Sequence, residues 1–192
     1  MAGEQSQAEW QRFVAAVQAV QADLRELIGK MPKGRPEAAI LEAYLLMVGD
    51  ELLADRVRAG IDEQRRCADW AVAAAINEVA SKLQAVDDPY LRERHHDVEF
   101  VGARLLRALS GAGPLDEQLH FDEPCIVVAR DLSPADTAGM LDAPVLGFVT
   151  EIGSRTSHTS IMARALEIPA VVGAADALVA IQSGDRLVVD GL

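Results

Sequence analysis

The sequence has few cysteines and no long hydrophobic run. Cys67 and Cys125 are the two cysteines among 192 residues, and their isolation excludes a cysteine-based metal or redox motif. We expect both to be buried or half-buried small residues. The apolar runs are too short for a signal peptide or a membrane-spanning helix, so a soluble cytoplasmic protein is expected.

Basic residues are also scarce relative to acidic ones. The chain carries 18 Lys and Arg against 30 Asp and Glu, which gives a net charge of −12. Such a charge argues against nucleic acid and anionic membrane surfaces as partners. A basic protein is a better match for this surface.

The first part of the sequence has helical periodicity. Apolar residues recur at intervals of three and four from Trp10 to Ile28, which predicts a long amphipathic helix. Further helices are predicted over 37–58, with Leu52 facing inward, and from Asp62 to about residue 86, with Trp70 on its apolar face. A fourth follows Asp87-Asp88-Pro89. We expect residues 8–112 to form a four-helix subdomain, arranged as an antiparallel bundle or as two hairpins.

The pattern changes after Pro114. Short β-rich runs occur at 125–129, 145–149, 170–172 and 186–190, and a helix start is predicted at Ser133-Pro134. Strands that alternate with helices predict an α/β domain over residues 113–192. The predicted fold class is therefore α/β plus all-α.

Residues 153–164 are the most informative stretch. They follow a predicted strand and run into a helical pattern, which places His158 in the first turn of a helix. The free N–H groups and positive dipole of a helix start bind phosphate, and Arg155 adds a permanent cation. A histidine in such a place can accept a phosphoryl group. From the residues alone, a hydroxyl-rich helix cap with a surface histidine is an equally open interpretation.

Residues 153–173 resemble the phosphohistidine signature of enzyme I of the sugar phosphotransferase system, and pyruvate phosphate dikinase and phosphoenolpyruvate synthase carry related versions. Ser154 stands where the family usually has a second glycine. The resemblance implies that Nε2 of His158 carries the phosphoryl group. It also implies that four further residues bind phosphate or orient the histidine: Arg155, Thr156, Thr159 and Ser133. Ser133 is also interpreted as an ordinary helix cap.

The helical part resembles the enzyme I subdomain that docks the carrier protein HPr. The similarity is carried by residues 37–43 and 87–94. It implies an HPr-like partner, and the positions that match the docking face are Tyr44, Met47, Glu51, Leu53, Leu83, Leu91 and Arg94. Family members often have a histidine at the position of Tyr44, so the carrier is expected to differ from the usual sugar-system protein.

Three other candidate sites are weaker. His95, His96 and Asp97 suggest metal ligands, but adjacent helical residues should point in different directions, so we expect a solvated helix face and no metal site. His120 lies in a polar connector and is expected to be exposed. Ser157 beside His158 lacks the G-x-S-x-G turn of a hydrolase.

The resemblance implies a partial phosphoenolpyruvate-protein phosphotransferase. In the family a phosphoenolpyruvate-binding barrel with Mg²⁺ ligands follows this region, so we expect residues 1–192 to need no cofactor, to exchange phosphate only with the carrier, and to be monomeric. Two alternatives stay open. One is the enzyme I-like domain of the dihydroxyacetone kinase phosphotransfer subunit, and the other is a carrier-binding module that does no chemistry.

Overall fold

The computed structural model describes residues 2–30, 36–112, 121–132, 136, 140, 143–153, 160, 163–164 and 167–191. The chain forms two compact units, Met1–Pro114 and Leu115–Leu192. None of the described helices combines the length and the apolar character that crossing a lipid bilayer requires.

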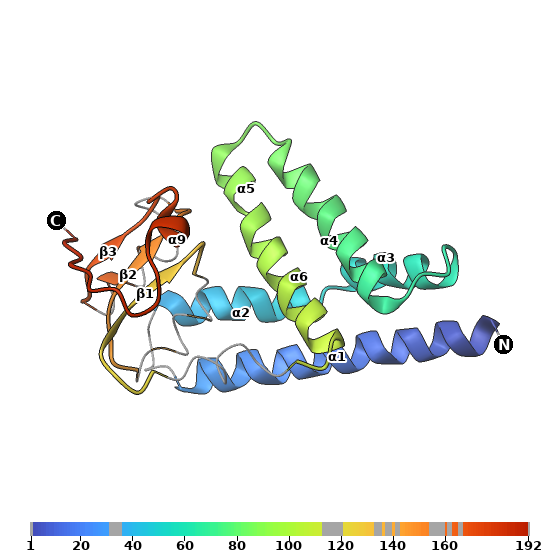
Figure 1. The fold of residues 1–192 in the computed structure, drawn as a ribbon. Coiled ribbons are helices and arrows are strands. Elements are labelled where there is room, and N and C mark those ends of the chain that lie inside the picture. Colours follow the sequence, from blue (N-terminus) through green and yellow to red (C-terminus); the bar gives the residue numbers. More distant parts are fainter. Residues whose placement is uncertain are drawn as a thin grey trace. The chain divides into compact units, whose positions relative to one another are not determined.

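The first unit is helical. Its helices in the described part of the chain are α1 (Ala2–Lys30), α2 (Pro36–Val48), α3 (Glu51–Asp62), α4 (Ala68–Gln84), α5 (Pro89–Glu93) and α6 (His95–Leu109). Figure 1 shows α4 and α6 side by side, and α1 packs against α2, α3, α4 and α6. The predicted helical subdomain is confirmed, although it is built from more helices than the four expected.

The long amphipathic helix is present as α1. Its buried side chains recur at intervals of three and four: Phe13, Ala16, Val20, Leu24 and Leu27. This stripe forms one side of the helical core, because an apolar face at helical spacing must be covered by neighbouring elements.

The predicted helix over 37–58 is wrong, because it is two helices. Asp50 adopts an extended conformation, and its side chain accepts a hydrogen bond from the Leu53 N–H at 3.1 Å, which caps α3. The break changes which residues face the core: Leu53 is buried, and Leu52, predicted to face inward, is 64% exposed.

The next two predicted helices also differ from the structure. Asp62 ends α3 and does not start α4; α4 begins after Cys67, and the N–H of Ala68 donates to Glu9 Oε2 at 2.7 Å. Trp70, predicted to be inward, is exposed and carries the Arg66 guanidinium 4.1 Å from its ring centroid. The predicted fourth helix is divided at Arg94 into α5 and α6.

Close helix packing requires glycine at one crossing. A Cβ atom at Gly102 of α6 would lie 2.7 Å and 2.8 Å from the two γ-carbons of Ile76 in α4. Gly102 and Ile76 are both buried, so the side chain of Ile76 packs directly against the backbone of α6 at this point.

The second unit contains a parallel three-stranded sheet in the order β1-β2-β3. The strands are β1 (Cys125–Ala129), β2 (Val145–Thr150) and β3 (Ala170–Val171), and a short helix, α9 (Ala177–Ala180), follows. The predicted α/β architecture is confirmed. Its core cluster contains Leu132, Met140, Phe148 and Ala163.

The predicted fourth strand is wrong. Residues 186–190 are described and are not in a strand. Val188 is 98% exposed, so its side chain is not packed as it would be in a sheet. A Cβ atom at Gly191 would lie 3.1 Å from the Cα of Pro169, which shows that the chain passes close to the start of β3 without joining the sheet.

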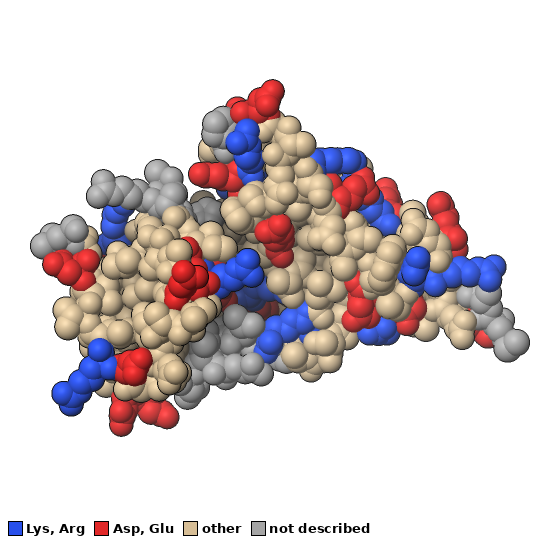
Figure 2. Space-filling model, turned by 45° about the horizontal axis from the view of Figure 1, so that its top comes forward, with Lys and Arg blue, Asp and Glu red and all other residues tan. Residues whose placement is uncertain are grey.

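Charged side chains of both signs share the surface. On the face drawn in Figure 2, the described Lys and Arg side chains are interspersed with Asp and Glu. Several form ion pairs, among them Arg12 with Asp69 at 3.0 Å and Arg58 with Asp62 at 2.5 Å. Exposed pairs of this kind contribute little to stability, so the apolar core remains the main stabilising feature of the helical unit.

Candidate functional site

In sequence, the predicted phosphohistidine loop is preceded and followed by well-packed residues of the second unit. His158, Arg155, Thr156 and Thr159 lie outside the described residues, as does Ser133. Their proposed roles therefore stay predictions. The described residues on either side show which structural elements precede and follow the loop in sequence.

The strand β2 ends shortly before the loop. Phe148 and Thr150 are fully buried, and Thr150 Oγ1 donates a hydrogen bond to the carbonyl oxygen of Ile152 at 2.7 Å. Gly153 has a φ of 131°, a conformation that favours glycine. The chain thus leaves the sheet after Thr150 and has a glycine-favouring conformation at Gly153.

The described residues that follow the loop are helical. Ser160, Ala163 and Arg164 are in helical conformation, and Ser160 and Ala163 are buried. The turn ends at Glu167, which has a φ of 57°, and the N–H of Ile168 donates to the carbonyl oxygen of Ala163 at 3.0 Å. The strand-to-helix transition that the sequence predicts on either side of His158 is present in these flanks.

The hydrophobic core of the second unit also contains the residue that precedes Ser133. Leu132, which precedes Ser133, is buried in the cluster that contains Phe148 and Ala163. The carbonyl oxygen of Thr150 accepts from the N–H of Ala174 at 2.9 Å, which ties the end of β2 to the segment after β3. One hydrophobic core thus anchors the chain next to Ser133 and the helix that follows His158.

The residues that match a carrier-docking face have different exposures. Tyr44 and Leu53 are buried, Met47, Leu83 and Arg94 are half-buried, and Glu51 and Leu91 are exposed. Direct contact with a docked protein is open to the exposed members, whereas Tyr44 and Leu53 could act only by holding their neighbours in place. Three exposed apolar residues nearby were not predicted as docking residues: Leu46, Leu52 and Tyr90.

Tyr44 belongs to a buried polar network. Its hydroxyl donates to Asp97 Oδ1 at 2.9 Å, and Arg94 Nη1 donates to Asp97 Oδ2 at 2.9 Å. Arg94 also donates to the hydroxyl of Tyr90 and lies over its ring. The hydrogen bond to Asp97, then that to Tyr90, raises the pKa of Arg94. The network joins α2, α5 and α6.

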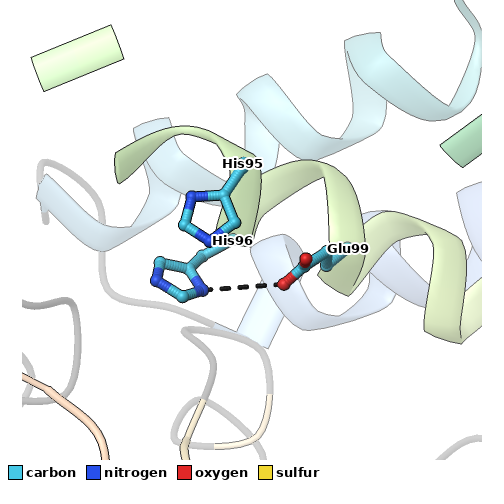
Figure 3. A group of neighbouring side chains, drawn as sticks. All are labelled: His95, His96 and Glu99. Atoms are coloured by element: carbon cyan, nitrogen blue, oxygen red, sulfur yellow. Dashed lines mark ion pairs between the residues drawn. The ribbon is translucent and has the colours of Figure 1, made fainter. Parts of the chain in front are cut away.

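The structure corrects two expectations about His95, His96 and Asp97. Asp97 is 2% exposed and is not part of a solvated face. The two histidine rings do not diverge, because their centroids lie 3.8 Å apart (Figure 3). His96 Nδ1 lies 3.7 Å from Glu99 Oε2 on the next turn of α6.

The two cysteines differ in exposure. Cys67, expected to be buried or half-buried, is exposed at the N-cap of α4, while Cys125 is half-buried as expected. Burial raises the pKa of the Cys125 thiol, which lowers the fraction of nucleophilic thiolate.

Similar proteins connect these features to one family. Residues 1–94 match the family model described as PEP-utilising enzyme, N-terminal, and residues 121–192 match PEP-utilising enzyme, mobile domain. The phosphoenolpyruvate-protein phosphotransferase of Cupriavidus necator is 38% identical over 98% of this chain, and that of Listeria innocua is 36% identical over 97%. The chain spans about a third of the length of these relatives.

Two solved structures support the same assignment. An enzyme I protein solved by NMR has a TM-score of 0.76 and 38% identity, covering 98% of this chain and 77% of that one. A structure described as the N-terminal domain of Enzyme 1 - Nitrogen has a TM-score of 0.60 and 31% identity, covering 88% of this chain and 68% of that one. The helical unit and the small parallel sheet match together in these proteins. The chain therefore belongs to the enzyme I family of PEP-utilising proteins, and it corresponds to the N-terminal domain of that family.

Proposed function

We propose that residues 1–192 relay a phosphoryl group through His158, in exchange with an HPr-like carrier protein. The observation that carries the proposal is the match to enzyme I over both units, in a chain whose residues 153–173 contain the phosphohistidine signature. The described flanks support it, because the strand β2 ends before His158 and the buried residues Ser160 and Ala163 after it are helical.

The proposed chemistry is an in-line transfer. A neutral imidazole nitrogen of His158, Nε2 by resemblance, forms a bond to phosphorus while the bond from phosphorus to the donor breaks, and the leaving group keeps that electron pair. Arg155 and the hydroxyls of Thr156 and Thr159 would balance the charge on the equatorial oxygens. Ser133 would orient the ring through a hydrogen bond.

We propose that the original donor of the phosphoryl group is phosphoenolpyruvate. The names of the relatives state this reaction, and Mg²⁺ would act with the barrel that follows this region in the family. Imidazole nitrogens are not preferred Mg²⁺ ligands, so the His95, His96 and Glu99 group is not a candidate for that ion.

The proposal is tested by separating binding from chemistry in His158→Ala. A phosphorylated HPr-type carrier should transfer labelled phosphate to the wild-type chain and not to this variant, while both bind the unphosphorylated carrier with the same affinity. His120→Ala, a second histidine variant, should transfer normally. Labelling of His158→Ala at the wild-type level would contradict the proposal.

The docking role of the helical unit has its own test. Leu91→Ala removes an exposed apolar side chain from the proposed carrier surface, and we expect carrier affinity to fall about three- to tenfold, in the range of a moderate interface contact. The matched control is Leu178→Ala, since Leu91 is 43% and Leu178 47% exposed and Leu178 lies in α9 of the other unit. An equal loss in both variants, or none in Leu91→Ala, would contradict this docking surface. Calorimetric titration with the carrier measures both.

A further inference from the structure

A compact group of nitrogen and oxygen donors lies where α6 begins. One ligand atom from each of His95, His96 and Glu99 falls within 4.8 Å of the other two, and Figure 3 shows the two rings on the same side of the helix as the carboxylate. Glu99 is one helical turn from both histidines, which is the spacing at which helical side chains meet. His96 and Glu99 are exposed and His95 is half-buried, so an ion could reach all three.

The structure fixes one of the imidazoles in a suitable tautomer. His95 Nδ1 lies 2.6 Å from the carbonyl oxygen of Arg92, and because a carbonyl can only accept, Nδ1 must carry the proton. The lone pair of His95 is therefore on Nε2. A histidine that binds a metal through one nitrogen commonly donates its other N–H to a backbone carbonyl in this way.

The neighbouring cations are directed elsewhere. Arg92 donates to the carbonyl oxygen of Val86 at 3.2 Å, and Arg94 is held by Asp97 and Tyr90. Both guanidinium groups are thereby held by other acceptors, which reduces their repulsion of a bound cation.

We propose that His95, His96 and Glu99 form a binding site for a divalent transition-metal ion of the Zn²⁺ class. Two imidazoles and one carboxylate suit Zn²⁺ and its neighbours, whereas Ca²⁺ and Mg²⁺ prefer oxygen ligands. With bonds of about 2.0–2.2 Å in tetrahedral geometry, ligand atoms lie about 3.3 Å apart, so the 3.7 Å pair of His96 and Glu99 needs little adjustment. Rotation of the exposed side chains of His96 and Glu99 would close the remaining separation to His95, and water would complete the coordination.

The test is a Zn²⁺ titration of the full chain by calorimetry. We expect the wild type to have a saturable 1:1 site, and His96→Ala and Glu99→Gln each to weaken it at least tenfold, or about 1.4 kcal/mol. The matched controls His120→Ala and Glu93→Gln should keep the wild-type affinity; Glu93 is exposed at the end of α5.

NMR measurement of the histidine side-chain nitrogen signals tests the same site without those variants. Zn²⁺ should shift the Nε2 signal of His95 and leave its Nδ1 protonated. Absence of saturable binding would overturn the proposal. Equal affinity in wild type, His96→Ala and Glu99→Gln would also overturn it, because the ion would then be held elsewhere.

Discussion

At the scale of single residues, Asp97 is the most informative side chain of the helical unit. Its carboxylate is buried and accepts hydrogen bonds from Tyr44 and Arg94. A buried charge is tolerated only when it is paired in this manner. The sequence places Asp97 in a polar run beside two histidines, and nothing in that run indicates which of the three faces the core.

Replacing Tyr44 with Phe tests this network. The change removes the donor to Asp97 and keeps the ring that packs 4.9 Å from the centroid of Phe100. Because a hydrogen bond to a buried carboxylate is lost, we expect the free energy of unfolding to fall by about 1.5–3 kcal/mol.

The matched control is Tyr90→Phe. Tyr90 also bonds to Arg94, but it is 64% exposed, so water can replace the lost hydroxyl and the effect should stay below about 0.5 kcal/mol. Urea unfolding followed by circular dichroism measures both. Equal losses in the two variants would show that burial does not increase the contribution of the Asp97 network to the free energy of unfolding.

At the scale of elements, the crossing of α4 and α6 sets how closely the helical unit can pack. Gly102 allows the approach because it has no side chain to meet Ile76. Alanine would favour the helix by its propensity, yet the added methyl group would overlap a buried side chain at 2.7 Å.

We expect Gly102→Ala to lower the free energy of unfolding by about 1–3 kcal/mol, because overpacking outweighs the propensity gain. Gly29→Ala is the control, since a Cβ atom there meets nothing within 4 Å and the change should be neutral or stabilising. Denaturant unfolding of both variants gives the comparison. A more stable Gly102→Ala protein would show that the helices separate at little cost.

The elements also show what the sequence could and could not predict. Apolar periodicity predicted α1, and β-rich runs predicted β1, β2 and β3, because one strong local pattern marks each. The break at Asp50 was missed, since apolar spacing continues across it although Asp50 is a good helix cap. The convergence of His95 and His96 depends on side-chain rotamers, which spacing does not determine.

At the scale of the whole molecule, the chain combines a helical unit and an α/β unit that match enzyme I together. The family signature around His158 could be recognised from sequence, because it is a run of particular residues at consecutive positions, and the role of that run stays a prediction. The carrier-docking surface stays a prediction. Two of its seven expected residues, Tyr44 and Leu53, are buried, and burial depends on how helices pack and not on local sequence.

We expect residues 1–192 to take up no label from phosphoenolpyruvate and Mg²⁺ alone. The reason is that the family resemblance assigns phosphoenolpyruvate binding to a barrel outside this region. Addition of a separately produced enzyme I barrel should restore labelling. Incubation with labelled phosphoenolpyruvate followed by electrophoresis under non-acidic conditions measures the result, and strong labelling without the barrel would contradict the expectation.

The most direct test of the account locates the phosphoryl group itself. The chain is mixed with a phosphorylated HPr-type carrier, digested with trypsin under non-acidic conditions, and analysed by mass spectrometry. Peptide 156–164, which contains His158, should gain one phosphoryl group that is lost on mild acid treatment, as expected for a phosphorus–nitrogen bond. An unmodified peptide, or a phosphate that survives acid and therefore sits on a hydroxyl, would contradict the central claim.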